Sequence, residues 1–337
     1  MEKWLAGRAG PGAEEGSFGD LEGEVAAITS GCALWTRPGW HLHALRGEKR
    51  VEFLHSYITQ EVRREPGEGA YGCLLTVKGS LVADLWAFLR EEDMLLLTSP
   101  SAGPSAVKHL KRYALLARVG IEDLSERQVT LSLVGPEAGD RATLLGAALP
   151  GNDLDHCTFQ RGEVTLTLVR NDWLGLPGYD LFVPREAAPA LAEELIAAGA
   201  RLVGEAAITA RRVSAGIPIY GVDMHEKTLP LEAGLEDRAI SYDKGCYTGQ
   251  EVVVRIKHRG KINRHLRGLR LSEPPPALPV ALYAEGGKEV SSLTSSAQTP
   301  GGARGLALVH RKYPPGTLLH VGAEGGPTAE VCELPFA

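Results

Sequence analysis

The chain has 337 residues, 44% of them hydrophobic and 23% charged, which is the composition of an ordinary globular protein. A chain of this length rarely folds around one core, so two or three domains are expected. The net charge of −6 argues against a protein that binds nucleic acid along its surface, and we expect no direct DNA binding. No apolar stretch is long enough to span a membrane, and the N-terminus lacks the apolar core of a signal peptide.

The cysteines indicate a reducing environment. There are five, an odd number, and they are widely spaced without a Cys-x-x-Cys pair, at positions 32, 73, 157, 246 and 332. We therefore expect no disulfide framework, and we expect a cytoplasmic location. The first residues are rich in Gly, Glu and Ala, which predicts a flexible N-terminal arm over residues 1–20.

The order of the predicted elements favours an α+β fold with mainly antiparallel sheet. Strands tend to cluster before the helices that cover them, unlike the strict alternation of a doubly wound parallel fold. Helices are predicted at 50–64, 103–118, from about 136, 185–198 and 205–214, and strands at 70–77, 81–89, 94–98, 129–135, 163–169 and 179–184. The proline-rich run 272–279 indicates a linker, and the short strands beyond it are typical of a small β-barrel.

The run Lys244-Gly-Cys-Tyr-Thr-Gly-Gln-Glu251 (KGCYTGQE) is the strongest chemical signal. Thr248 and Glu251 have the spacing of a capping box at the start of a helix. Cys246 would then lie just outside a helix N-terminus, where the macrodipole and the Lys244 ammonium favour thiolate over thiol. The alternative is a buried structural cysteine beside a tight glycine turn.

A basic stretch follows this run. Residues 255–270 contain no acidic residue and seven Lys or Arg side chains, at 255, 257, 259, 261, 264, 267 and 270. Such a stretch can capture a polycarboxylate or a phosphate. It could also be a solvated helix end whose cations complement the helix dipole. An RNA stem-loop would fit the charge, but the aromatic side chains on which single strands stack are absent from the stretch.

A strand after a glycine turn carries a candidate carboxylate, Asp84. It could belong to a site or could simply be a hydrogen-bonding residue at a strand end. Tyr220 and Tyr247 could form walls for a flat heterocycle, although both are equally compatible with half-buried packing.

The KGCYTGQE run and the basic stretch resemble the signature of the YgfZ-type folate-binding proteins, a branch of the glycine-cleavage T-protein (aminomethyltransferase) superfamily. The resemblance extends along the chain beyond about the first twenty residues. It includes the segments 53–62, 74–88, 133–138, 212–221 and 292–321.

The resemblance implies a three-lobed, T-protein-like ring of mainly antiparallel sheets with covering helices, plus a C-terminal β-barrel. The implied domains are the arm 1–20, a folate-binding region 21–262 and the barrel 265–337. The middle region would consist of two intertwined α+β lobes, one inserted at roughly 52–128.

The implied function is that of a tetrahydrofolate-binding accessory protein in iron–sulfur cluster assembly or repair, affecting cluster-dependent enzymes that include tRNA-modifying ones. Its partners would be iron–sulfur assembly proteins or client enzymes, with no resident metal. The alternatives are a tetrahydrofolate-dependent aminomethyltransferase and a non-catalytic binding module. The resemblance implies catalytic roles for Cys246, Lys244 and Asp84, and folate binding by Asp84, Arg212, Tyr247, Gln250, Glu251, Arg255, Lys257 and Arg259.

Two positions depart from the T-protein pattern. T-proteins carry paired aspartates where this chain has Ala83-Asp84, and a pterin-binding Glu where this chain has Ser214. A Ser offers the pterin one weaker hydrogen bond in place of a carboxylate. Together with Cys246, these departures favour the accessory protein over the aminomethyltransferase.

Overall fold

The computed structural model describes residues 1–8 and 16–336, except for the side chain of Arg259. Of the arm predicted over residues 1–20, residues Glu2–Ala6 form a short helix, α1, and residues 9–15 lie outside the described part of the chain.

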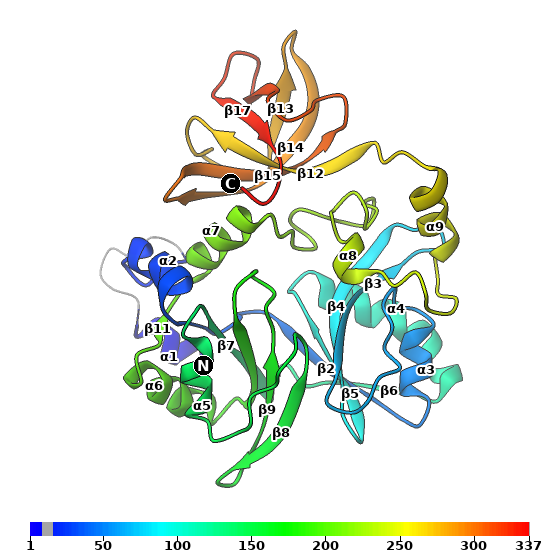
Figure 1. Ribbon diagram of the computed structural model, residues 1–337, viewed down its shortest axis with the longest axis vertical. Coiled ribbons are helices and arrows are strands. Elements are labelled where there is room, and N and C mark those ends of the chain that lie inside the picture. Colours follow the sequence, from blue (N-terminus) through cyan, green and yellow to red (C-terminus); the bar gives the residue numbers. More distant parts are fainter. Residues whose placement is uncertain (9–15, 337) are drawn as a thin grey trace.

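The chain forms two open sheets and a barrel (Figure 1), which confirms the predicted α+β class. Among the strand pairs of the described residues, β1–β11 alone is parallel. The first sheet contains, in spatial order, β11 (Arg201–Leu202), β1 (Ala33–Trp35), β7 (Gln128–Val134), β10 (Gly178–Pro184), β9 (Val164–Arg170) and β8 (His156–Arg161). The second contains β3 (Gly69–Leu75), β4 (Leu81–Leu89), β5 (Asp93–Thr98), β2 (His41–Arg46) and β6 (Gly120–Asp123). The closed barrel contains β12 (Arg264–Leu271), β15 (Gly302–His310), β14 (Lys288–Thr299), β13 (Val280–Ala284), β16 (Leu318–Val321) and β17 (Thr328–Cys332).

The two open sheets are intertwined in sequence. The chain leaves the first sheet after β1, forms all five strands of the second sheet, and returns to the first sheet with β7. Helices α5 (Ala138–Thr143) and α6 (Ala188–Ala197) pack on the first sheet, and α3 (Arg50–His55) and α4 (Ala102–Ala117) on the second. Helix α2 (Leu21–Ser30) packs on α7 (Glu205–Ala215), which contacts the barrel strand β14, and the short helix α8 (Glu236–Ala239) packs on β3. No helix within the described ranges combines the length and apolar character needed to cross a membrane.

Two expectations about single elements were wrong. The helix predicted over 50–64 ends at His55, because the backbone beyond it turns its carbonyl groups toward the Lys244 ammonium instead of continuing the helix. The proline-rich run 272–279 does not precede the barrel; it connects β12 with β13 inside it.

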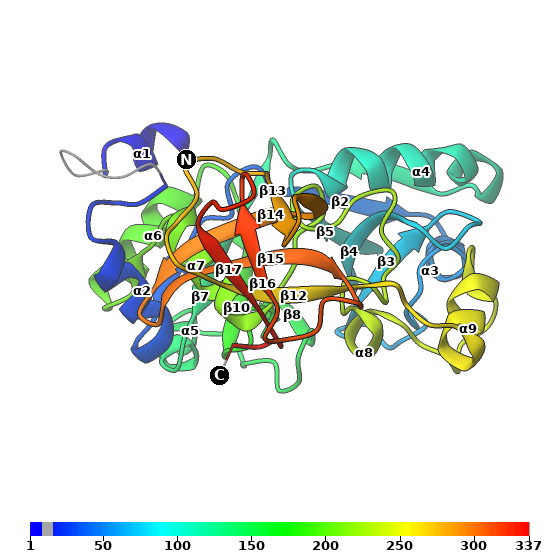
Figure 2. The same ribbon diagram turned by 90° about the horizontal axis from the view of Figure 1, so that it is seen from above.

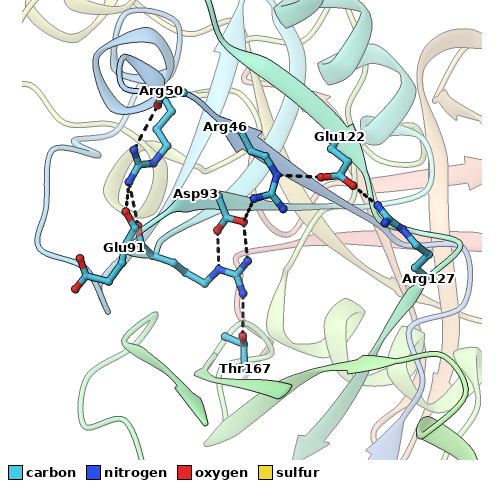
Figure 3. Close-up of polar contacts among 9 residues, drawn as sticks. Arg46, Arg50, Glu91, Asp93, Glu122, Arg127 and Thr167 are labelled. Atoms are coloured by element: carbon cyan, nitrogen blue, oxygen red, sulfur yellow. Dashed lines mark hydrogen bonds and ion pairs between the residues drawn. The ribbon is translucent and has the colours of Figure 1, made fainter. Parts of the chain in front are cut away.

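An ion network joins the two open sheets at the edge shown in Figure 3. Asp93 on β5 accepts two hydrogen bonds from Arg90, at 2.7 and 2.8 Å, and Arg46 lies 3.5 Å away. Arg90 also donates to the Thr167 hydroxyl on β9, at 3.4 Å, so the network crosses from the second sheet to the first. Arg46 in turn contacts Glu122 on β6, at 2.9 Å.

A buried ion pair lies inside the first sheet. Arg37, just after β1, donates from Nη2 to both carboxylate oxygens of Asp180 on β10, at 3.0 and 2.9 Å. Ser132 donates to one of these oxygens at 2.5 Å and Asn171 to the other at 2.6 Å. Both ionic side chains are 2% exposed, so neither exchanges its partner for water.

Four of the five tryptophans gather around this ion pair. The Arg37 guanidinium lies 4.8, 4.4 and 5.1 Å from the ring centroids of Trp35, Trp40 and Trp173. Trp86 on β4 continues the cluster, 5.6 Å from Trp40 and 5.9 Å from Trp173. The cluster therefore links the first sheet to the second.

Candidate functional site

A cavity of about 350 Å³ lies where the two sheets and the barrel meet, and we call it the central cavity. The barrel lies above the two open sheets in Figure 1 and in front of them in the view from above (Figure 2). The lining combines Tyr71 from β3, Trp173 from the turn after β9, Arg238 from α8, and the segments 215–218, 231–235, 265–267 and 333–335. All three parts of the fold contribute to it.

The second sheet supplies an aromatic wall. Tyr71 lies opposite Trp86 in the β3–β4 register, and the two rings are 4.6 Å apart. Trp86 packs edge-on against Trp173, which reaches the cavity from the first sheet. Flat aromatic side chains from two sheets can hold a flat heterocycle by stacking.

Asp84 lies directly behind this wall. Tyr71 lines the cavity, and its hydroxyl donates to Oδ2 of Asp84 at 2.8 Å. The other oxygen, Oδ1, is buried and has no hydrogen-bond partner among the described residues. Burial raises the pKa of Asp84 to about 6, and the Tyr71 hydrogen bond only partly opposes this. The carboxyl group can therefore accept or donate a proton near neutral pH.

The raised pKa predicts a pH-dependent effect of Asp84→Asn. The folded-state pKa of about 6 lies above the usual 3.8, so the penalty for ionising Asp84 grows as pH rises from about 4 to 6 and is complete above 6. Asn carries no such penalty. The variant should therefore be more stable than wild type at pH 7, by up to about 3 kcal/mol, and equally stable near pH 4.

Urea unfolding at the two pH values measures this difference. Asp243→Asn, at an exposed position, is the control and should change stability at neither pH. An Asp84→Asn variant that is less stable than wild type at pH 7 would show that a partner stabilises the ionised carboxylate.

Cations reach the cavity from α8 and β12. Arg238 lies 5.8 Å from the Tyr71 ring centroid and donates to the Trp173 carbonyl at 3.4 Å. Arg267, from the predicted basic stretch, also lines the cavity and pairs with Glu333. Arg264, from the same stretch, donates instead to Glu232, another lining residue, at 3.0 and 2.8 Å. Positive charge therefore reaches the cavity through only part of the stretch.

Arg212 makes contacts that hold the fold together. Its guanidinium donates to Asp223 at 2.8 Å and to Ser295 on β14 at 2.7 Å, and its side chain is 5% exposed. These contacts attach α7 to the barrel. Ser214, two residues later, donates its hydroxyl to the Ala210 carbonyl at 2.8 Å, so this hydroxyl is already engaged within its own helix.

Lys244 is held in a cage of backbone carbonyl groups. Its ammonium donates to the carbonyls of His55, Ile58 and Gln60, at 2.7, 2.7 and 3.0 Å. Burial lowers the pKa of Lys244 to about 8, so it remains mostly charged at pH 7. The cage ties the KGCYTGQE run to the segment after α3.

The predicted capping box was wrong. Helix α9 (Gln250–Arg259) begins at Gln250 with Gly249 as its N-cap, and no side chain caps it. Gly249 has φ +85°, and a Cβ there would lie 2.6 Å from the Thr76 carbonyl, so the position requires Gly. The close approach of the β3–β4 turn, rather than Thr248, decides where the helix starts.

Cys246 is exposed in the loop before α9, whereas Cys32 and Cys73 are buried. Its neighbour Tyr247 is buried, with a hydroxyl that has no partner within the described residues, and burial raises the pKa of Tyr247 to about 12. The motif thus presents its thiol to solvent and anchors itself through Lys244 and Tyr247.

The remaining predicted ligands lie on α9, at the outer edge of the molecule (Figure 1). Gln250 is its first residue, Glu251 pairs with Arg255 one turn later, and the Lys257 ammonium lies 3.3 Å from the Tyr242 ring centroid. The side chain of Arg259 lies outside the described part of the chain. None of the described α9 side chains lines the central cavity.

The sequence reasoning missed Tyr71, Trp173 and Arg238. Tyr71 could have been found, because a β3–β4 hairpin places alternate residues of both strands on one face, and Asp84 lies on the same face. Trp173 and Arg238 carry no comparable signal, since they lie in a turn and in a four-residue helix.

Comparison with known proteins supports the fold and the relationship. The family described as the GCVT N-terminal domain matches residues 8–244. An aminomethyltransferase of Rubrobacter xylanophilus is 29% identical over 327 residues, which are 95% of this chain and 87% of the relative. The tRNA-modifying protein YgfZ of Yersinia enterocolitica is 30% identical over 231 residues, 67% of each chain.

A solved structure agrees in fold. The glycine cleavage system aminomethyltransferase T from Bartonella henselae superposes with a TM-score of 0.86 over 100% of this chain and 96% of that one, at 23% sequence identity. The T-protein-like architecture expected from the sequence is confirmed. The family match covers well over half of the chain, and the chain therefore belongs to the GCVT N-terminal domain family.

Proposed function

We propose that the protein binds a reduced folate, tetrahydrofolate, in the central cavity. The observation that carries the proposal is the position of Asp84, a buried carboxyl group with an unpaired oxygen, directly behind the aromatic wall of Tyr71 and Trp173. A pterin is flat and carries hydrogen-bond donors, so it suits an aromatic wall backed by a carboxylate. The relatives named aminomethyltransferase and YgfZ support the proposal.

The glutamate tail of a folate carries carboxylates, which Arg side chains hold with two hydrogen bonds. Arg238 and Arg267 line the cavity and are the first candidates for this contact. Arg255, Lys257 and Arg259 on α9 remain candidates for a longer polyglutamate tail.

We further propose that the protein serves as an accessory factor for iron–sulfur enzymes, including those that modify tRNA, with Cys246 as its reactive group. The support is the exposed thiol in KGCYTGQE and the relative named tRNA-modifying protein YgfZ. Lys244 acts by holding the loop of Cys246 in place, through the carbonyl cage.

The relatives named aminomethyltransferase favour a second candidate, transfer of an aminomethyl group to tetrahydrofolate. Two residues argue against this reaction. Ala83 occupies the position at which T-proteins carry a second carboxylate, and the Ser214 hydroxyl donates to its own helix. Asp84 would be the proton-handling group if this reaction took place, with Lys244 holding the adjoining loop.

Calorimetric titration of monoglutamyl tetrahydrofolate tests the binding proposal. Wild type should bind, more weakly at high salt because charged groups contribute. Arg238→Gln should weaken binding by about tenfold through loss of a charge-assisted hydrogen bond, while Arg255→Gln, on α9, should not. No heat at low salt, or loss of binding in Arg255→Gln alone, would rule out the proposed site.

The accessory role is tested with the same protein in cells. Cys246→Ser should keep the affinity for tetrahydrofolate but fail to restore iron–sulfur enzyme activity to a deletion strain. Cys332→Ser, in the barrel, is the matched control and should restore it. Full restoration by Cys246→Ser would remove the thiol from the mechanism.

A further inference from the structure

A second cavity, of about 390 Å³, lies beside α4, and we call it the α4 groove. One wall is α4 itself, and the other is formed by the β3–β4 turn and Tyr220. The groove and the central cavity share no lining residue. The α4 groove is therefore a separate site that could hold a different ligand.

The α4 wall is polar and basic. It consists of Ser105, Lys108, His109, Arg112 and Tyr113, which are spaced i, i+3, i+4, i+7 and i+8 and so form one continuous helix face. A helix face turned toward a neighbouring element is normally apolar. The opposite wall supplies the apolar part of the groove, through Val77, Leu81 and Val82.

Two of these residues repel each other. Lys108 and Arg112 are four positions apart, an arrangement of like charges that destabilises a helix. Neither is in an ion pair with a carboxylate of the described residues, whereas most Arg residues of the two open sheets are paired. Glu226 adds one carboxylate to the lining, which leaves an excess of one positive charge. A bound anion between Lys108 and Arg112 would remove the repulsion.

His109 adds an unused hydrogen-bonding group. The residue is 9% exposed, and its Nε2 has no partner among the described residues. Its ring is held edge-on between Tyr57 and Tyr113, at centroid distances of 6.1 and 5.7 Å. Burial lowers the pKa of His109, so the ring is neutral at pH 7 and can donate or accept at Nε2. A buried polar nitrogen without a partner is costly unless something else satisfies it.

We propose that the α4 groove binds a small amphipathic anion, with its phosphate or carboxylate group held between Lys108 and Arg112 and its apolar part against Val77, Leu81 and Tyr220. His109 bonds the ligand next to the anionic group. Tyr220 lines the groove and is 7% exposed.

Phenyl phosphate and phenylacetate are suitable probes, with benzyl alcohol as the uncharged counterpart. Titration followed by the ring carbon signals of histidine in NMR should show a saturable shift of His109 with one or both anions. A response to phenyl phosphate alone assigns the natural ligand to phosphate compounds, and a response to phenylacetate alone assigns it to carboxylates. Benzyl alcohol should bind more weakly, because it lacks the charge.

Variants on the same helix give the decisive comparison. The double variant Lys108→Gln/Arg112→Gln should weaken binding by about tenfold or more, because each cation provides a charge-assisted contact. Lys111→Gln changes an exposed α4 residue outside the groove lining and should bind as wild type does. Arg238→Gln, in the central cavity, should also bind the probes normally. The proposal is overturned if neither anion gives saturable binding, if benzyl alcohol binds as tightly as the anions, or if Lys111→Gln loses as much affinity as the double variant.

Discussion

Asp180→Ala is expected to lower the free energy of unfolding by about 3–5 kcal/mol, because it leaves the Arg37 guanidinium charged, buried and without its carboxylate. The same change removes the acceptor of Ser132 and Asn171. The guanidinium cannot turn to water, since it is enclosed by Trp35, Trp40 and Trp173. Urea unfolding at pH 7 measures the loss.

Glu194→Ala is the matched control. Glu194 makes a two-point contact with Arg161, as Asp180 does with Arg37, but its side chain is 59% exposed. Its removal should cost at most about 1 kcal/mol. If both variants lost the same free energy of unfolding, burial would not determine how much the Arg37–Asp180 pair contributes to stability.

Lys244→Met is expected to cost about 3 kcal/mol, because Met fills the space but leaves the carbonyls of His55, Ile58 and Gln60 without their donor. In this variant the loop that carries Cys246 should also become more mobile. The Thr248 amide, which donates to the Ser56 carbonyl at 3.3 Å, should exchange its hydrogen faster, and hydrogen-exchange mass spectrometry follows this directly.

Lys257→Met provides the comparison for this prediction. The ammonium groups of Lys244 and Lys257 each lie over a tyrosine ring, 5.2 Å from the Tyr247 centroid and 3.3 Å from the Tyr242 centroid. The Lys257 side chain is 38% exposed, so its loss should change stability by less than about 1 kcal/mol. If Lys244→Met were as stable as wild type with unchanged exchange at Thr248, the ammonium would not hold the loop, and a direct role at Cys246 would become the better explanation.

The hairpins of the second sheet could be predicted from the sequence because their signals are local. The strands around Lys78-Gly79 are apolar and end at turn residues, and the predicted limits 70–77 and 81–89 agree closely with β3 and β4. Asp84 was placed on the correct strand for the same reason. Its burial could not be read from the strand alone, since it depends on Tyr71 and on what covers that face.

The end of α3 and the start of α9 could not be predicted because distant residues decide them. Lys244 accounts for the end of α3 although it lies 189 positions from His55. The turn carbonyl of Thr76 decides the conformation of Gly249 in the same way. Local capping patterns describe helix ends only where tertiary contacts do not compete.

In the candidate site, too, some features follow from local sequence and others depend on residues far apart in the chain. The contiguous KGCYTGQE run pointed to Cys246, and the structure exposes this thiol to solvent. The contiguous segment 212–221 likewise predicts folate binding by Arg212, yet its partners Asp223 and Ser295 place it in a contact between α7 and the barrel. The cavity lining comes from all three parts of the fold, so no single segment of the sequence carries its pattern.

A crystal structure of the protein with tetrahydrofolate tests the central claim most directly. The account predicts density for the pterin in the central cavity, against Tyr71 and Trp173 on the side that Asp84 backs, with the tail carboxylates toward Arg238 or Arg267. A saturated crystal whose central cavity stays empty, with the folate bound elsewhere or not at all, would contradict it.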